Sequence, residues 1–401
     1  MDLSFILNQL GEERDRYFDA VIPPIVQSAI FAHPNVAGMR ARIADEFSEF
    51  VYTRGQNPTV ALVAKKLAAL EGGESCLLFG SGAAAMAAAV LASVAAGDEV
   101  IAVDKPYAWT GSLLRRWLPR FGVATRMIDA RDPAAVAAAI GERTRLIVLE
   151  SPNSLTFEQQ DLAAIAAIAR ARGVRTLVDN SYATPLGQSP LALGVDLVVH
   201  SATKYLNGHS DVLAGALIGS EALVREVFNG PYMTLGGILS PHDAWLLLRG
   251  LRTLPARLAQ IAATTATVIH WLQGQPGVRR IHYPQHQSYP QSALSTAQLH
   301  HANGLFSIEL EVPDLAAVDR FVDALERFVI AASWGGYESL VFPVAGVRHW
   351  RSLADPCSVP LSLVRFSIGL EGAEVLIADL AQALARITPP SAAPGCPGPP
   401  A

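Results

Sequence analysis

Cysteine is scarce in this chain. The 401 residues include 3 cysteines, Cys76, Cys357 and Cys396, which lie far apart in the sequence and form no CxxC pair. A small, scattered set of this kind argues against a disulfide framework and against the common zinc motifs. We therefore expect a protein of the reducing cytoplasm without a metal centre.

Long apolar runs and an excess of positive charge are also missing. The longest uncharged apolar stretch, residues 82–97, is mostly alanine and falls short of the ~18 residues that a membrane span needs. The net charge of -5 leaves no basic face for nucleic acid. Residues 1–20 are acidic and interrupted, unlike a signal peptide. We therefore expect neither a membrane nor a nucleic acid as a partner.

Hydrophobic residues are abundant and follow an alternating pattern. They make up 51% of the chain, which is enough for a large core. Short strand-like runs at 99–103, 123–128, 146–149 and 176–180 are separated by helical stretches at 111–118, 133–140 and 162–172. This rhythm predicts an α/β fold around a mostly parallel, doubly wound sheet. Ligands of such sheets bind at the carboxyl ends of the strands.

The remaining sequence predicts four parts. We expect an N-terminal arm over 1–60, an α/β domain over 61–235, a smaller α+β domain over 236–388, and a disordered Pro/Gly-rich tail over 389–401. The smaller domain should hold a long helix over 241–272, strands at 304–310 and 363–368, and helices at 315–327 and up to about residue 387.

A polar stretch of the smaller domain, residues 275–298, is rich in proline and histidine. We predict that it is a long surface loop. His282, His286, His300 and His301 have no convincing spacing for a metal, so we expect them at the surface.

The segment His200-Ser201-Ala202-Thr203-Lys204-Tyr205 carries the strongest chemical signal. It follows the apolar run 195–199, so Lys204 should lie where a buried strand gives way to a loop. Desolvation there lowers the pKa of an amine, and a neutral amine can attack an aldehyde. Ser201 and Thr203 carry hydroxyls suited to a phosphate. We therefore predict a pyridoxal-phosphate lysine; a lysine that merely extends out of a strand end is the alternative.

Two other segments suit a phosphate. Ser81 and Gly82 open an alanine-rich helix, and backbone N–H groups at a helix start attract anions. Tyr52 and Arg54 lie one residue apart in an extended segment and should point to the same side, where the arginine offers charge and fork geometry. Each motif alone is weak, since tight turns and exposed loops look the same.

Three further residues stand where their type is unusual. Asp179 ends a buried run and needs a partner, which can be a pyridinium nitrogen or a structural hydrogen bond. Arg365 lies inside an apolar strand and needs an anion, either a substrate carboxylate or a structural acid. Tyr107 follows the first strand and can stack on a flat ring or belong to the core.

Together these motifs resemble the Cys/Met-metabolism family of pyridoxal-phosphate enzymes, from about residue 22 to residue 387. The resemblance implies a fold-type-I, aspartate-aminotransferase-like subunit that binds pyridoxal 5′-phosphate and acts on a small amino-acid substrate. It also implies a homotetramer whose active sites are shared across a dimer. The implied catalytic residues are Lys204, Tyr107 and Asp179. The implied cofactor-binding residues are Tyr52 and Arg54 from the neighbouring subunit, Ser81, Gly82, Tyr107, Asp179, Ser201, Thr203 and Lys204.

The implied substrate-binding residues are Arg365, Ser333, Trp334 and Tyr232. Trp334 and Ser154 resemble the cystathionine β-lyase branch, whereas Asn153, Ser181-Tyr182 and Tyr107-Ala108-Trp109 depart from it. We therefore expect β-elimination of cystathionine or a related thioether. Two alternatives stay open: a γ-lyase or γ-synthase acting on a γ-substituted amino acid, and a nicotinamide oxidoreductase, which the missing GxGxxG disfavours.

Overall fold

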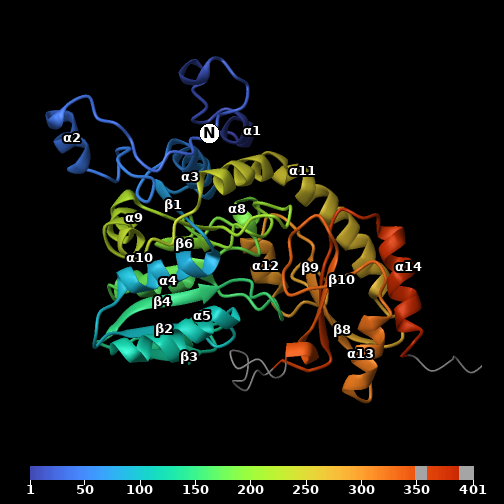
Figure 1. Ribbon diagram of the computed structural model, residues 1–401. Coiled ribbons are helices and arrows are strands. Elements are labelled where there is room, and N and C mark those ends of the chain that lie inside the picture. The colour runs from blue at the N-terminus through green and yellow to red at the C-terminus, as the bar shows by residue number, and fades with distance from the viewer. Residues whose placement is uncertain (348–358, 388–401) are drawn as a thin grey trace, which may run out of the picture.

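The structure is a computed structural model, and it describes residues 1–347 and 359–387. Two β-sheets lie side by side, and a long helix runs across both (Figure 1). The larger sheet has seven strands in the order β1-β7-β6-β5-β4-β2-β3, and the smaller has five in the order β10-β11-β12-β9-β8. The predicted fold class, a mostly parallel sheet with a smaller α+β part, is confirmed.

The larger sheet is parallel except for β7, which runs antiparallel to both of its neighbours. Its strands are short, apolar and buried, as expected for a sheet covered on both faces. Because these strands are parallel, their carboxyl ends lie at the same edge of the sheet, where Glu150 pairs with Asp179 and Asp179 with Val199. The strands are β1 Ser75–Phe79, β2 Glu99–Val103, β3 Ala124–Ile128, β4 Thr144–Glu150, β5 Arg175–Asp179, β6 Leu197–His200 and β7 Gly215–Gly219.

Helices cover both faces of this sheet. Successive residues of a strand point to opposite faces, so Leu77 and Phe79 pack on the side of α4 while Leu78 packs on the side of α3. Side-chain caps start several of the helices, as Ser81 does for α4. The helices of this region are α3 Pro58–Glu71, α4 Gly82–Ser93, α5 Ala108–Ser112, α6 Pro133–Ala139, α7 Leu162–Ala171, α8 Thr184–Gly187, α9 Glu221–Val227 and α10 Met233–Leu235, with short irregular turns η2 Leu113–Trp117, η3 Leu118–Phe121 and η4 Phe228–Tyr232.

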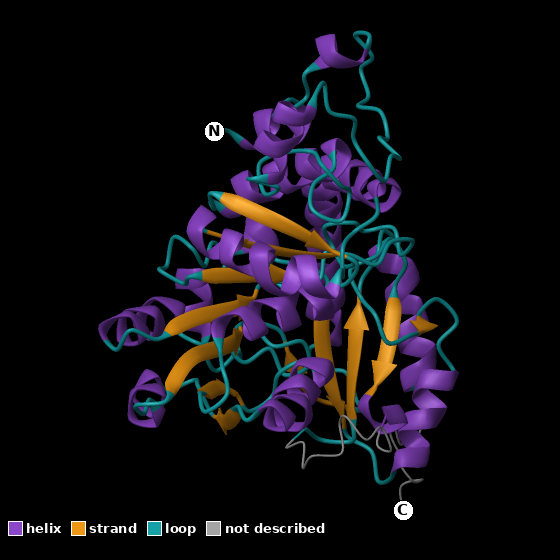
Figure 2. Ribbon diagram, turned by 60° about the vertical axis from the view of Figure 1, so that its left-hand side comes forward, coloured by secondary structure: helices purple, strands orange, loops and turns teal. Residues whose placement is uncertain are grey.

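The smaller sheet is antiparallel apart from the β10–β11 pair. Its strands stand beside the larger sheet in a different orientation, with helices on the outside (Figure 2). The strands are β8 Val278–His282, β9 Leu305–Leu310, β10 Val329–Ile330, β11 Leu340–Pro343 and β12 Leu363–Ser367; the helices are α12 Ser292–Gln298, α13 Leu315–Asp323 and α14 Ala373–Leu384, with the turn η5 Val344–Val347.

The long helix α11 (Pro241–Leu272) has the bounds that the sequence predicts. Gly250 in this helix lies against the backbone oxygen of Asn207, in the loop just after Lys204, and a side chain at 250 would collide with that oxygen. Arg257 of the same helix lies over Gly208 of that loop. Because α11 also packs against α14, one helix connects the Lys204 loop with the smaller sheet.

The N-terminal arm carries short helices and many exposed apolar side chains. It contains α1 (Leu3–Asn8), η1 (Arg14–Tyr17) and α2 (Val36–Ile43), and α2 lies at the edge of the molecule (Figure 1). Phe18 is fully exposed, and Ile30 and Val36 are each about two-thirds exposed.

Several predictions need correction. The stretch 275–298 is not a surface loop, because it contains β8 and α12. His282 on β8 is buried rather than exposed, and its Nε2 pairs with Glu309 at 2.7 Å. The expected helix 111–118 begins earlier, as α5, and continues as irregular turns. Proline, histidine and glycine hid these elements in the sequence.

Some expectations stay predictions. The domain boundaries are among them, and the tail 389–401, Cys357 and Cys396 lie outside the described residues. Within the described part of the chain, no helix has the length and apolar character of a membrane span. The same residues contain no cluster of three or more His, Cys, Asp or Glu side chains suited to a metal ion.

Candidate active site

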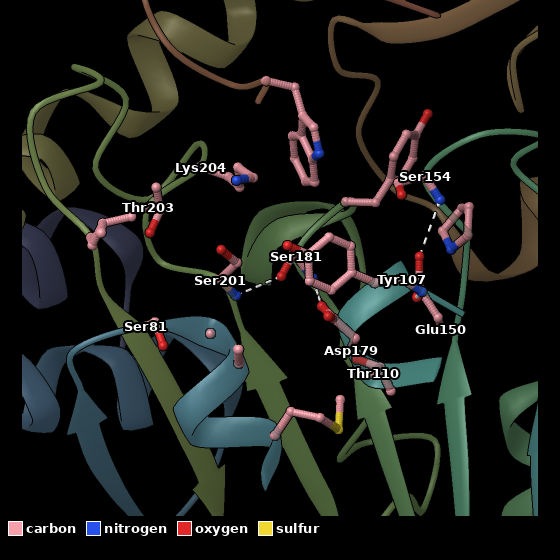
Figure 3. A pocket seen from close by; sticks show the side chains of 17 residues that line it. Ser81, Tyr107, Thr110, Glu150, Ser154, Asp179, Ser181, Ser201, Thr203 and Lys204 are labelled. Atoms are coloured by element: carbon pink, nitrogen blue, oxygen red, sulfur yellow. Dashed lines mark hydrogen bonds between the residues drawn. The ribbon is translucent and has the colours of Figure 1, made fainter. Parts of the chain in front are cut away.

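Lys204 lies in the turn that follows β6 and lines a cavity of about 150 Å³ (Figure 3). Its Nζ donates a hydrogen bond to Ser333 Oγ at 3.1 Å and lies 5.6 Å from the centroid of the Trp334 ring. Within residues 1–347 and 359–387, no carboxylate lies within ion-pair distance of this amine. Burial, aided by the positive charge of Arg365, lowers the pKa of Lys204 to about 8. The amine is therefore partly neutral near physiological pH.

Hydroxyls and a helix start gather at one end of the cavity. Ser81, Gly82, Ser201 and Thr203 all line it, and Gly82 is the first residue of the 12-residue helix α4. A Cβ at position 82 would lie 2.8 Å from Ser201 Cα, so only glycine fits there. Backbone N–H groups at such a helix start attract anions. This end of the cavity suits a phosphate.

The other side of the cavity carries two acids. Asp179 ends β5, and its Oδ1 accepts a hydrogen bond from the Ser181 backbone N–H at 2.9 Å. Glu150 ends the neighbouring strand β4 and accepts from the backbone N–H groups of Tyr107 and Ser154. Burial and the negative charge of Asp179 raise the pKa of Glu150. Asp179 thus lines the cavity beside a second acid, Glu150, which holds its own proton more tightly than an ordinary glutamate does.

Tyr107 and Trp334 line this cavity, and Arg365 contacts the backbone of Ser154, which also lines it. Tyr107 is 47% exposed, and burial of its phenol together with the charge of Glu150 raises its pKa. Trp334 is buried and packs 5.5 Å from the Tyr205 ring. Arg365 donates to the backbone oxygens of Ser154 and Ala332, both at 3.1 Å.

Arg365 is a buried cation without an acidic partner. Its guanidinium lies 4.8 Å from the Phe342 ring centroid, and no carboxylate of the described residues forms an ion pair with it. Burial lowers its pKa to about 10. The sequence left two interpretations of this arginine, a partner for a substrate carboxylate and a structural salt bridge. No such salt bridge is present in the described part of the molecule.

Three predicted site residues lie apart from this cavity. Tyr52 and Arg54 are exposed in the arm, with the guanidinium carbon 5.5 Å from the tyrosine ring centroid. Tyr232 is buried in the core, where its hydroxyl donates to the Leu78 oxygen at 3.2 Å and its ring packs edge-on against Phe79. Tyr232 is not among the residues that line this cavity, and its expected place beside the substrate stays a prediction.

Sequence reasoning missed several lining residues. Glu150, Ser181, Met86, Thr110, Tyr182 and Leu213 all line the cavity. Glu150 and Ser181 carried a usable signal, since each belongs to a polar cluster at a strand end. Leu213 and Met86 carried none, because apolar residues of this kind are usually core.

The cavity residues fit pyridoxal 5′-phosphate. A partly neutral lysine suits its aldehyde, the hydroxyl-lined start of α4 suits its phosphate, and Asp179 suits its ring nitrogen on the opposite side (Figure 3). Lys204, Ser201 and Asp179 come from the ends of the neighbouring strands β6 and β5, which explains how residues distant in sequence surround one ligand.

Comparisons with known proteins agree with this geometry. Residues 6–385 match the family model of the Cys/Met metabolism PLP-dependent enzymes. The chain is 40% identical over 378 residues to the L-methionine gamma-lyase of Pseudomonas putida, covering 93% of this chain and 95% of that protein. It is 36% identical over 376 residues to the cystathionine beta-lyase MetC of Staphylococcus haemolyticus, covering 93% and 92%.

A solved structure shows the same fold. The crystal structure of metB from Corynebacterium glutamicum superposes with a TM-score of 0.90 at 31% identity and covers 96% of this chain and 98% of that one. The chain therefore belongs to the Cys/Met-metabolism family of trans-sulfuration lyases and synthases, and pyridoxal 5′-phosphate is its cofactor.

Proposed function

We propose that the protein is a carbon–sulfur lyase that acts by β-elimination on cystathionine or a related thioether amino acid. With cystathionine, the products are homocysteine, pyruvate and ammonia. The observation that carries this proposal is the position of Trp334, which is buried against Tyr205 and stands 5.6 Å from the lysine amine.

The bound cofactor supplies an electron sink for the charge that develops at the substrate Cα. Lys204 would hold the cofactor through its Nζ, and the same amine, when free, would take the Cα proton of the substrate. A pKa of about 8 leaves this amine able to accept and return a proton near neutrality. Asp179 keeps the ring nitrogen protonated, because an adjacent carboxylate stabilises a positive charge.

Arg365 holds the substrate carboxylate. Its guanidinium donates to the backbone oxygens of Ser154 and Ala332 and, at 3.5 Å, of Ser333, which occupies at most three of its five N–H donors. The remaining donors and the unbalanced positive charge favour a carboxylate, which a fork-shaped guanidinium binds in two places. The contact with Ser154, which lines the cavity, puts Arg365 directly behind the wall.

Trp334 favours β- over γ-chemistry because it restricts the space around Lys204. Gly335 has a φ of +78°, which only glycine adopts easily, and its N–H donates to Ser367 Oγ at 3.0 Å. The indole is therefore held in place. β-Elimination needs only the Cα proton and the Cβ–S bond, whereas γ-elimination requires a second proton transfer at Cβ and more freedom for the side chain.

A γ-elimination, with 2-oxobutyrate as the keto acid, is the second candidate. It is supported by the 40% identity with a protein named as an L-methionine gamma-lyase. The cavity offers two groups for two proton transfers, the Lys204 amine and the Tyr107 hydroxyl.

Identification of the keto acid separates the two candidates. The holoenzyme is given cystathionine, and the product is identified by mass. We expect mainly pyruvate, with Trp334→Leu lowering its formation by about tenfold or more, since pocket shape is worth ~1–3 kcal/mol. Trp271→Leu, a change on α11 against the core, is the matched control and should leave the product unchanged. Mainly 2-oxobutyrate from the wild-type enzyme would reject the β-lyase proposal in favour of the second candidate.

We also propose a homotetramer in which Tyr52 and Arg54 reach the cofactor phosphate of a neighbouring subunit. Both residues are exposed and lie in the arm, whose Phe18, Ile30 and Val36 expose apolar surface that an assembly would cover. Hybrids of Arg54→Ala and Lys204→Ala subunits should regain activity, because one of their mixed sites is intact. Hybrids that form without any recovery would show that each site uses one chain.

A further inference from the structure

A buried polar layer lies on the far side of the strand ends that surround the cavity. Glu71, the last residue of α3, is 2% exposed, and its Oε2 pairs with His200 Nε2 at 2.7 Å. Its Oε1 accepts from Asn180 Nδ2 at 3.0 Å. Gln188 Nε2 donates to Asn180 Oδ1 at 3.0 Å and to the Ser151 oxygen at 2.8 Å. Glu71, Asn180, Gln188 and His200 are thus joined in one hydrogen-bonded group.

This group is adjacent in sequence to the lining of the cavity. Asn180 follows Asp179, and His200 precedes Ser201, while Asp179 and Ser201 line the cavity (Figure 3). Alternate residues of an extended chain point to opposite sides. Each of the two strand ends, β5 and β6, therefore gives one side chain to the cofactor side and the next to the buried layer.

The third strand end is connected in the same way. Glu150 lines the cavity, and the backbone oxygen of the following residue, Ser151, accepts from Gln188. The Ser201 N–H in turn donates to Ser181 Oγ at 2.6 Å, which links the β6 end to the β5 end on the cavity side. The layer thus connects all three strand ends that carry the site.

Stability alone does not account for this arrangement. Glu71 stands at the C-terminal end of α3, where the helix dipole disfavours a negative charge. Replacing both partners of a buried hydrogen bond with apolar groups of the same shape can be nearly neutral or stabilising. Glu71 keeps a carboxylate at this helix end and bonds to His200 and Asn180, at the ends of β6 and β5. We therefore explain it by the strand ends that it positions.

We propose that Glu71 and His200 are positioning residues of the cofactor site, which set the strand-end geometry of Asp179 and Ser201. Through Asp179 they place the partner of the ring nitrogen, and through Ser201 they place the phosphate end. This inference rests on the cofactor-binding roles given to Asp179 and Ser201, and not on the choice between β- and γ-elimination.

The smaller sheet supplies a matched control. His282 on β8 also pairs through its Nε2 with a carboxylate oxygen, Oε1 of Glu309 on β9, at 2.7 Å, and both side chains are about 90% buried. This pair belongs to the five-stranded sheet, and neither residue lines the cavity of Lys204. Loss of the bond in either pair should cost similar stability, whereas only the Glu71–His200 pair should affect the cofactor.

The test compares His200→Leu with His282→Leu and measures the cofactor directly. The readouts are the pH midpoint of the visible absorbance of bound pyridoxal phosphate, its dissociation constant from each protein, and the melting temperature. For His200→Leu we expect a shifted midpoint and about 10- to 100-fold weaker retention, the range found for outer partners of metal ligands. His282→Leu should lower the melting temperature but leave midpoint and affinity unchanged.

Two further variants keep the test decisive if His200→Leu does not fold. Glu71→Gln preserves volume and one acceptor oxygen while removing the charge, and it should shift the midpoint in the same direction. His200→Gln, whose amide can donate from near the position of Nε2, should restore part of the affinity relative to His200→Leu. A wild-type midpoint and affinity in both Glu71→Gln and whichever His200 variant folds would overturn the inference, whatever the melting temperature. Mainly 2-oxobutyrate from cystathionine would reject the β-lyase proposal alone.

Discussion

Desolvation lowers the pKa of two lysines, Lys66 and Lys204, whose amines have different neighbours. Lys66 on α3 is fully buried, and its Nζ bonds to Glu12 Oε1 at 3.1 Å and to the backbone oxygens of Ile6 and Leu7. Lys204 has one hydrogen-bond acceptor, Ser333 Oγ, and faces the ring of Trp334. The first amine fastens the N-terminal arm to the body of the subunit, and the second is available for chemistry.

The difference between them lies in their neighbours rather than in burial. Desolvation is the first cause of a lowered pKa at both lysines. At Lys66, the bond and charge of Glu12 work against that shift. At Lys204, the positive charge of Arg365 adds to it, and Asp179 opposes it as the smallest influence. A nearby cation lowers the pKa of both lysines, Arg252 at Lys66 and Arg365 at Lys204, so the difference between them is the carboxylate of Glu12, which bonds to Lys66 but not to Lys204.

The largest expected effect comes from removing the reactive amine. Lys204→Ala should lose the reducible link to pyridoxal phosphate and lower activity by about 10⁴-fold, the upper range for a general acid–base group. Borohydride reduction followed by peptide mass analysis measures the link. Lys66→Met is the control and should keep the link. A link that survives in Lys204→Ala would show that Lys204 is not the lysine that holds the cofactor.

The next effect concerns the acid beside the reactive lysine. Asp179→Asn keeps an oxygen that can accept from the Ser181 N–H but loses the charge that holds the ring nitrogen protonated. We expect cofactor to be retained and turnover to fall on the order of 10²–10³-fold, as for loss of one electrostatic stabiliser. Turnover near the wild-type level, with full cofactor occupancy, would assign Asp179 a purely structural role.

Replacing Lys66 should lower the free energy of unfolding. Lys66→Met leaves Glu12 buried with two other partners, Arg252 at 2.9 Å and Arg14 at 3.7 Å. Breaking a buried pair on one side costs about 3 kcal/mol, which urea unfolding can measure. The double variant Lys66→Met/Glu12→Gln should recover most of that loss. If the single variant is as stable as the wild type, the Lys66–Glu12 pair does not anchor the arm.

The smallest effect is a pH dependence. In the cofactor-free protein, capture of pyridoxal phosphate requires the neutral Lys204 amine, whose pKa is lowered to about 8. Below that pH the ammonium form dominates and capture is slow; above it, the rate should reach a plateau. Arg365→Met removes a charge that lowers this pKa, so the midpoint should move upward. Stopped-flow absorbance across pH 6–10 measures this midpoint. An unchanged midpoint in Arg365→Met would show that Arg365 does not lower the pKa of Lys204.

Much of the site was predictable because parallel strands end at one edge. Lys204 and Asp179 each follow an apolar run, and this local pattern places both at the carboxyl ends of strands that prove to be neighbours. The four residues that the family resemblance assigns to the phosphate, Ser81, Gly82, Ser201 and Thr203, line one cavity, and their role in binding it stays a prediction.

The remainder depends on contacts between distant residues. His200 and Glu71 are 129 positions apart, and nothing local in either segment predicts that they pair. Strand β7 begins and ends with a glycine and is not among the strands that the sequence predicts; its pairing with β1 and β6 makes it one. His282 looked exposed because its surroundings are polar, but pairing of β8 with β9 buries it against Glu309.

The close approach of α11 to the loop after Lys204 has a consequence for enzyme redesign. Libraries that vary Ser333 or Trp334 exchange one side chain for another and leave the backbone that carries the lysine where it is. Position 250 offers no such freedom, because even a methyl group there meets the Asn207 backbone oxygen and must displace it. Substrate scope can therefore be engineered from the loop of the smaller sheet, whereas the glycine of the long helix is best left out of any mutagenesis scheme.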